Sequence, residues 1–139
     1  MKRYLLGILV LAVATGALAQ IKRTPSPAGA EVYFISPKDG ETLSGPVSVK
    51  FGLKGMGVAP AGIALENTGH HHLIIDAKTP PVDAPIPADA NHVHFGKGQT
   101  ETTLTLAPGK HTLQLVFGDL LHVPHDPAVI SRKITITVE

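Results

Sequence analysis

Proline and glycine recur along the whole chain, and this feature most limits what the chain can fold into. The sequence contains 12 Pro and 14 Gly among its 139 residues. Both residue types disfavour helix interiors and favour turns. Beyond the first nineteen residues, no window of about eleven residues has apolar side chains at helical spacing. We therefore expect short strands joined by turns, in one domain, because compact domains commonly hold about 100–150 residues.

The first nineteen residues have the three parts of a secretory signal peptide. Lys2 and Arg3 form a positive start, residues 5–14 are apolar, and residues 17–19 (Ala-Leu-Ala) make a cleavage site before Gln20. The apolar run is shorter than the roughly 20 residues that span a bilayer. No cysteine follows the site, so a lipoprotein anchor is excluded. We predict that this leader is removed and that the protein is periplasmic or secreted.

Charge and cysteine content exclude several classes of protein. The net charge is +1, and it becomes −1 when Lys2 and Arg3 leave with the leader. A nucleic-acid binder needs clustered basic residues facing phosphates, so that class is not expected. The chain has no cysteine, which excludes disulfides, thiolate metal sites and cysteine nucleophiles. A hydrophobic fraction of 43% is sufficient for a folded core.

Alternating apolar and polar residues predict seven strands in a single domain over residues 31–139, after a flexible lead over residues 20–30. The predicted strands are residues 31–36, 46–53, 70–76, 91–95, 101–106, 111–117 and 133–138. This number of short strands favours an all-β fold, an immunoglobulin-like antiparallel β-sandwich. The alternative is a cupin-like β-barrel, which the His92-Val93-His94 motif followed by Glu101 partly resembles.

Six of the eight histidines lie in three tight groups. These candidate metal ligands are His70, His72, His92, His94, His122 and His125. Two residues at positions i and i+2 of a strand point to the same face, so the first two groups have chelating geometry. The third group lies in a loop in which Pro124 restricts the backbone.

Strand direction predicts that these three groups meet at one end of the domain. If successive strands alternate in direction, the start of the third strand and the ends of the fourth and sixth strands share one rim. His111 begins the sixth strand and is expected at the other end, with a structural role. His71 shares a face with Leu73 and Ile75, so we expect it to pack in the core.

The ligand types narrow the choice of metal. Imidazoles suit zinc, copper, nickel or iron, whereas calcium and magnesium prefer oxygen. The missing cysteine excludes a blue-copper site, and Met56 is the single methionine beyond the leader, which argues against a methionine-rich Cu(I) carrier. Gln20 at the new N-terminus excludes an N-terminal histidine brace. Cu(II) or Zn(II) remains, beside the alternative of a structural or pH-sensing histidine cluster.

Three long motifs resemble a known family. They are NTGHHHLIID (67–76), NHVHFGKGQTETTLTLAPGKHTLQL (91–115) and GDLLHVPHDPAV (118–129). They are similar to a family of small exported bacterial proteins that is catalogued as domain of unknown function 4399, and the resemblance covers residues 31–139. It implies an exported single-domain protein and no particular activity.

The leading functional hypothesis is a metal carrier or buffer whose partners are the ion and an exported or membrane-bound metalloprotein. Asp119 and Glu66, in loops at the same rim, are expected to orient imidazoles by hydrogen bonding. The rival is an immunoglobulin-like module that binds a protein or a glycan through its loops. A metal-dependent enzyme with an open histidine site is a second alternative. The sequence has no nucleophile elbow, H-E-x-x-H motif or P-loop, so we do not predict an enzyme.

Overall fold

The computed structural model describes residues 19–139, and this part of the chain forms strands, turns and loops without a helix. Nearly all of the predicted signal peptide (residues 1–19) therefore lies outside the described residues. In the described part, no helix has the length and apolar character needed to cross a membrane.

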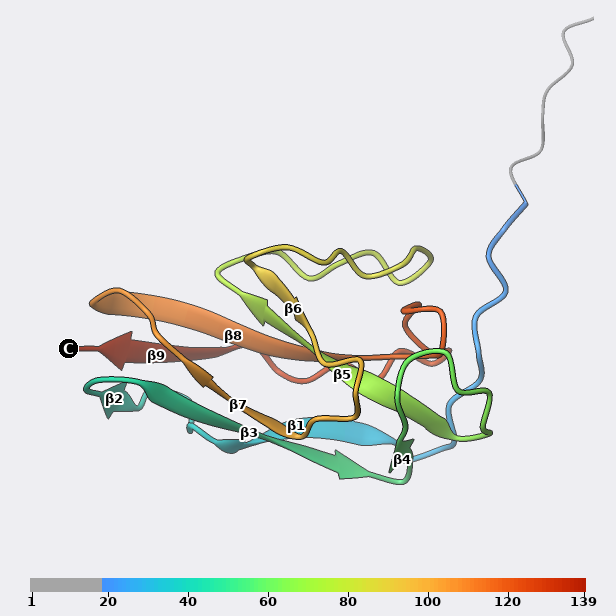
Figure 1. Cartoon of the computed structure of the whole chain (residues 1–139), viewed down its shortest axis with the longest axis horizontal. Coiled ribbons are helices and arrows are strands. Elements are labelled where there is room, and N and C mark those ends of the chain that lie inside the picture. Colours follow the sequence, from blue (N-terminus) through green and yellow to red (C-terminus); the bar gives the residue numbers. More distant parts are fainter. Residues whose placement is uncertain (1–18) are drawn as a thin grey trace, which may run out of the picture.

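The strands form two facing sheets (Figure 1). The smaller sheet is antiparallel, in the order β1-β3-β7, and consists of β1 (Glu31–Ser36), β3 (Val47–Lys54) and β7 (Glu101–Leu104). The larger sheet has the order β2-β9-β8-β5-β4, with β6 also paired to β5. Its strands are β2 (Thr42–Leu43), β9 (Ile134–Val138), β8 (Gly109–Gly118), β5 (Thr68–Ile75), β4 (Gly57–Val58) and β6 (His92–His94).

The hydrophobic core lies between the two sheets and follows from the alternation of side chains along each strand. In β3, Val47, Val49 and Phe51 are buried, whereas the intervening Ser48 and Lys50 are exposed. The alternate residues of β8 and β9 complete the core from the other sheet; they include Leu113, Leu115, Phe117, Ile134, Ile136 and Val138. Successive side chains of a strand point to opposite faces, so apolar residues spaced by two identify the face that packs against the other sheet.

The predicted β-sandwich is confirmed, and the alternative of a cupin-like barrel is wrong, because the two sheets do not close into one barrel. All seven predicted strands are present. The sequence reading missed β2 and β4, two parallel strands of two residues each, which are too short to show an alternation. The simple up-and-down order also fails, because β6 pairs in the larger sheet and the next strand, β7, pairs in the smaller one.

Strand directions nevertheless bring histidine-containing segments to one end of the larger sheet. β5 is antiparallel to both β6 and β8, so the end of β8 lies beside the first half of β5 and the end of β6 lies beside its middle (Figure 1). The register pairs His72 with His94 and His70 with Gly118.

The outer face of β5 is also covered. The loop between β5 and β6, residues 76–91, is rich in proline. Its Ile86 packs with Ile74 and Val116 of the larger sheet, and these three side chains form a second, smaller apolar cluster. The backbone N–H of Ile86 donates a hydrogen bond to the carbonyl oxygen of His122 (2.8 Å). The loop thus encloses the outward-facing side chains of β5 from one side.

At the other end of β8, His111 has a structural role, as its place in the sequence predicts. Its Nδ1 lies 2.6 Å from Oδ2 of Asp76 and its Nε2 lies 2.7 Å from the carbonyl oxygen of Ala107. The hydrogen bond to Asp76, followed by the contact with Ala107, raises the pKa of His111 above its ordinary value of 6.5. Protonated His111 therefore ties the β5–β6 connection to the β7–β8 turn.

Replacing His111 with alanine is expected to reduce stability in a pH-dependent way. Because the folded state holds the proton more tightly, this contribution is complete below pH 6.5 and is lost as the pH rises through the raised pKa. His111→Ala should lower the free energy of unfolding by about 1–2 kcal/mol at pH 5.5 and by less at pH 9. Urea denaturation of both proteins at the two pH values measures this difference. A loss that grows with pH would contradict the assignment.

Candidate metal centre

The three consecutive histidines of β5 divide between the two faces of the strand. The ring of His71 points into the core, 5.0 Å from the ring of Phe51 and 5.0 Å from that of Phe117. His70 and His72 point to the outer face, as expected for residues at i and i+2. The triplet therefore contributes one packing residue and two residues to the site.

Four imidazoles meet on that outer face, and we call them the histidine cluster: His70 and His72 from β5, His94 from the end of β6, and His122 from the loop after β8. The centroid of His70 lies 4.7 Å from that of His72, 5.0 Å from that of His94 and 5.0 Å from that of His122. His94 and His122 are 4.7 Å apart. The four rings form one compact group drawn from three separate segments.

Three of the four rings could hold a metal ion. His70, His94 and His122 each offer one nitrogen, and these nitrogens all lie within 4.8 Å of one another. Around a tetrahedral zinc ion with Zn–N distances of 2.0–2.1 Å, imidazole nitrogens are about 3.4 Å apart. To bind one ion, the three nitrogens must therefore approach one another by about 1 Å, which rotation of the rings can supply. The ring of His72 adjoins the group, 5.2 Å from that of His94 and 5.9 Å from that of His122.

All three imidazoles of β5 are buried without hydrogen-bond partners among the described residues, His71 in the core and the other two in the histidine cluster. His70 and His72 are 0% and 1% exposed, and neither ring nitrogen of either residue has a partner among the described residues. Burying a polar group without a partner costs free energy, and such groups in native proteins call for an explanation. A bound ion would supply a partner for one nitrogen of each ring. His94 is exposed and His122 half-buried, so the cluster is open to solvent on their side.

Burial keeps the imidazoles of His70 and His72 uncharged at neutral pH. Burial lowers the pKa of His70 to about 4, with further contributions from His122 and His94, and Asp119 partly opposes the shift. Burial, followed by the charges of the other three rings, lowers the pKa of His72 to about 3. Burial also lowers the pKa of His94. A metal ion binding at pH 7 would therefore displace no proton from His70.

Two glycines leave the space that the rings occupy. A Cβ atom at Gly118 would lie 2.8 Å from Cε1 of His72, and one at Gly96 would overlap the ring of His94. Real Cβ atoms do not make such contacts, so a side chain at Gly118 would displace the buried ring of His72 and one at Gly96 would displace the exposed ring of His94. The sequence reading missed both residues. The pairing of Gly118 with His70 across β5 and β8 reveals its role, and this pairing depends on the register.

Asp119 fixes the loop that carries His122. Its Oδ1 accepts hydrogen bonds from the backbone N–H groups of Leu121 (2.9 Å) and Val123 (3.0 Å), and its carbonyl oxygen accepts one from the N–H of His122 (2.9 Å). His122 has a φ of 68°, a left-handed conformation that is uncommon for a residue other than glycine. The loop is therefore tightly turned, and its hydrogen bonds hold His122 in that conformation.

The two acidic residues predicted to orient imidazoles do not contact them. Asp119 accepts hydrogen bonds from backbone N–H groups and from the hydroxyl of Thr24, and it acts on the cluster through the loop. Glu66 is exposed and, among the described residues, makes no hydrogen bond to a histidine. The expectation of direct contacts is corrected for both residues.

Two of the six predicted ligands lie outside the cluster. His92 lies at the start of β6, two residues before His94, and pairs with Ile74 of β5. Its Nδ1 lies 2.8 Å from Oδ1 of Asp89. His125 is 0% exposed and stacks on Phe117, with a centroid distance of 5.8 Å. Its Nδ1 and Nε2 lie 3.3 Å and 3.2 Å from backbone carbonyl oxygens, because the chain after His122 turns into the interior. The expectation that all six histidines converge is therefore wrong for these two.

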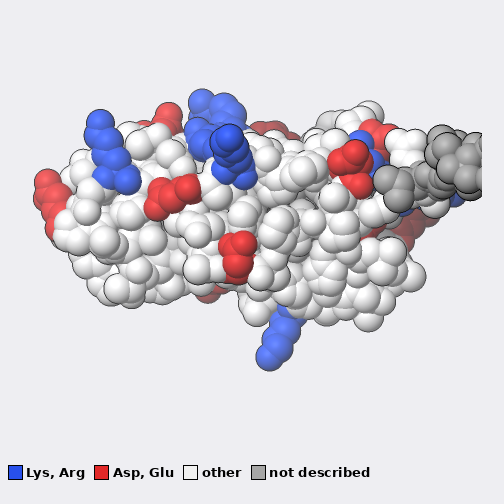
Figure 2. Space-filling model, turned by 90° about the horizontal axis from the view of Figure 1, so that it is seen from above, with Lys and Arg blue, Asp and Glu red and all other residues white. Residues whose placement is uncertain are grey.

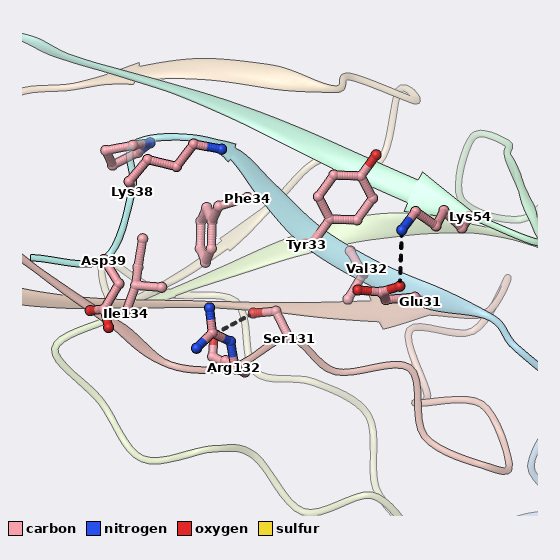
Figure 3. A pocket seen from close by; sticks show the side chains of 11 residues that line it. Glu31, Val32, Tyr33, Phe34, Lys38, Asp39, Lys54, Ser131, Arg132 and Ile134 are labelled. Carbon is pink, nitrogen blue, oxygen red and sulfur yellow. Dashed lines mark hydrogen bonds and ion pairs between the residues drawn. The ribbon is translucent and has the colours of Figure 1, made fainter. Parts of the chain in front are cut away.

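The rest of the surface offers a different kind of hollow. A cleft of about 270 Å³ lies between β1 and the segment that leads into β9, lined by Tyr33, Phe34, Arg132 and other residues (Figure 3). It includes no histidine. On the face seen in Figure 2, cationic and anionic side chains are interspersed, without the continuous basic stripe of a nucleic-acid interface.

Comparisons with known proteins give a family and nothing beyond it. Neither the curated proteins nor the solved structures contain a match to this chain. One family model matches residues 49–139, a span that includes all four rings of the histidine cluster. The protein belongs to that family, which is described as a domain of unknown function, DUF4399.

Proposed function

We propose that this protein binds one Zn(II) or Cu(II) ion per chain through His70, His94 and His122, and acts as a metal carrier or buffer. The observation that carries the proposal is the meeting of three imidazole nitrogens within 4.8 Å at a site where His70 is buried without any other partner. Neutral imidazole is a preferred ligand of both ions.

The donor set supports a reversible binding site more than a catalytic one. Three histidines with a fourth position open to water also occur in hydrolytic zinc sites, which need a general base beside the metal. Asp119, the buried carboxylate among the described residues, accepts three hydrogen bonds through its side chain, and none of them comes from an imidazole. The ring of His72 lies 4.7 Å from that of His70 and 5.2 Å from that of His94, so a shift of this ring would be needed to bring a fourth nitrogen to the ion. The engagement of Asp119 by its three hydrogen bonds favours holding an ion over activating water.

The proposal also includes export of the protein from the cytoplasm. The sequence features of residues 1–19 support cleavage before Gln20 and a periplasmic or secreted location. A carrier in that location would exchange its ion with an exported or membrane-bound metalloprotein. The mass of the protein recovered from the periplasm or medium tests the cleavage.

Metal titration of the untagged chain tests the binding. Competition with a chromophoric chelator should show one equivalent of Zn(II) or Cu(II) bound with a dissociation constant below about 1 μM. The control is the triple variant His70→Asn, His94→Asn and His122→Asn, which should bind no ion at that concentration. If the wild-type chain binds no more metal than this variant, the carrier role fails and the rival role, a protein- or glycan-binding module, takes its place.

A further inference from the structure

The residues that follow the predicted leader hold the loop on which His122 lies. Arg23 is half-buried and donates hydrogen bonds from Nε to the carbonyl oxygen of Pro124 (3.1 Å) and from Nη2 to that of His125. Its guanidinium also lies 3.4 Å from Oδ1 of Asp126. Residues 23–26, which we call the strap, are thus attached to the segment after His122. Figure 1 shows the N-terminal segment reaching the end of the sandwich at which β8 ends.

Backbone hydrogen bonds continue this attachment. The N–H of Ser26 donates to the carbonyl oxygen of Asp126 (3.0 Å), and the N–H of Asp126 donates to that of Thr24 (2.9 Å). The hydroxyl of Ser26 donates to the carbonyl oxygen of Pro127 (2.6 Å). The lead that was predicted to be flexible over residues 20–30 is therefore paired with another segment from Arg23 onward. A sequence pattern cannot reveal this pairing, because its partners lie about 100 residues away.

Thr24 connects the strap to the histidine cluster. Its hydroxyl donates a 2.7 Å hydrogen bond to Oδ2 of Asp119, whose other oxygen holds the N–H groups of Leu121 and Val123. Asp119 is 3% exposed, so Thr24 is the donor that satisfies this buried oxygen. The connection runs from Thr24 through Asp119 to the turn in which His122 adopts its left-handed conformation.

We propose that the strap positions His122 for metal binding, with Thr24 and Asp119 as the positioning residues. The part of this inference that concerns affinity rests on the proposed function. The part that concerns the position of His122 does not, because these hydrogen bonds join groups of the chain itself and involve no nitrogen of the histidine cluster. Removing contacts that orient a metal ligand typically weakens binding by 10–100-fold.

The strap supplies its own matched control. Thr24 and Ser26 are both half-buried, and each donates one hydroxyl hydrogen bond. The bond from Ser26 ends on Pro127, so of these two hydroxyls the one that is bonded to Asp119 is that of Thr24. Thr24→Val keeps the size of the side chain and removes its hydroxyl. Ser26→Ala removes the other hydroxyl, and Thr24→Ser retains the critical one.

Two measurements test the proposal. In the metal-free protein, hydrogen exchange at the N–H groups of Leu121 and Val123 should become about tenfold faster in Thr24→Val and stay within twofold of wild type in Ser26→Ala. In chelator competition, the dissociation constant for Zn(II) should rise about tenfold in Thr24→Val. It should stay within about twofold in the other two variants.

The outcomes are separable. Unchanged exchange in Thr24→Val, or equal acceleration in Ser26→Ala, would overturn the inference. Faster exchange with unchanged metal affinity would overturn the role of the strap in metal binding. If the wild-type chain binds no metal, the proposed function fails, and the exchange data alone then decide whether Thr24 positions His122.

Discussion

Replacing His94 with alanine is expected to raise the dissociation constant for Zn(II) at least a hundredfold while leaving the fold intact. His94 offers one of the three nitrogens that lie within 4.8 Å of one another, so its loss leaves two ligands. The loss should exceed the 10–100-fold that removing a contact around a ligand costs. The residue is exposed, so the free energy of unfolding of the metal-free protein should change by no more than about 0.5 kcal/mol. Chelator competition and urea denaturation measure the two effects.

His92→Ala is the matched control for this prediction. His92 lies two residues earlier on the same strand, yet its ring is hydrogen-bonded to Asp89 and lies outside the histidine cluster. The variant should bind Zn(II) within about twofold of wild type. Equal losses of affinity in the two variants would mean that the ion binds elsewhere on β6, and the proposed ligand set would be abandoned.

The largest loss of stability is expected from a single methyl group at Gly69. A Cβ atom there would overlap the backbone oxygen of Gly118 and would lie 2.8 Å from Cε1 of both His125 and Phe117. The backbone oxygen belongs to the neighbouring strand β8, so relief requires the two strands to separate or the buried rings to move. Gly69→Ala should therefore lower the free energy of unfolding by about 3 kcal/mol, at the upper end of the usual cost of overpacking.

Gly57→Ala provides the comparison, because a Cβ atom at Gly57 would have a single neighbour, Cγ2 of Thr68 at 3.4 Å. Gly57 lies on β4, the strand paired with the start of β5, and its substitution should change the free energy of unfolding by less than about 1 kcal/mol. Urea denaturation of both variants gives the difference. Similar stabilities for the two variants would show that β5 and β8 tolerate separation at this end.

Much of the fold and part of the site follow from the sequence because both depend on local periods. The alternation of Val47, Val49 and Phe51 identifies the buried face of β3, and the same rule separates His71 from its two neighbours. Strand direction then brings the histidines of β5 beside the ends of β6 and β8 without knowledge of the sheet order.

The remaining features depend on contacts that no local period encodes. His125 follows His122 by three residues, yet its ring lies in the interior, with its two nitrogens 3.2 Å and 3.3 Å from the carbonyl oxygens of Thr68 and Phe117. The attachment of Thr24 to Asp119 and the space left by Gly118 likewise join residues that are distant in the chain. These features require the register and the loop paths, which the sequence alone does not determine.

The three consecutive histidines of β5 also protect the strand against misalignment. If β5 slipped by one residue against β8, every side chain would exchange faces. His70 and His72 would then enter the apolar space between Phe51 and Phe117, where one imidazole now fits, and Leu73 and Ile75 would leave the core for the outer face. A metal ion would find one imidazole from β5 where the aligned strand presents two. The aligned strand therefore keeps one imidazole in the core and two on the outer face, and an ion bound by the two would add to the free-energy difference between the two alignments.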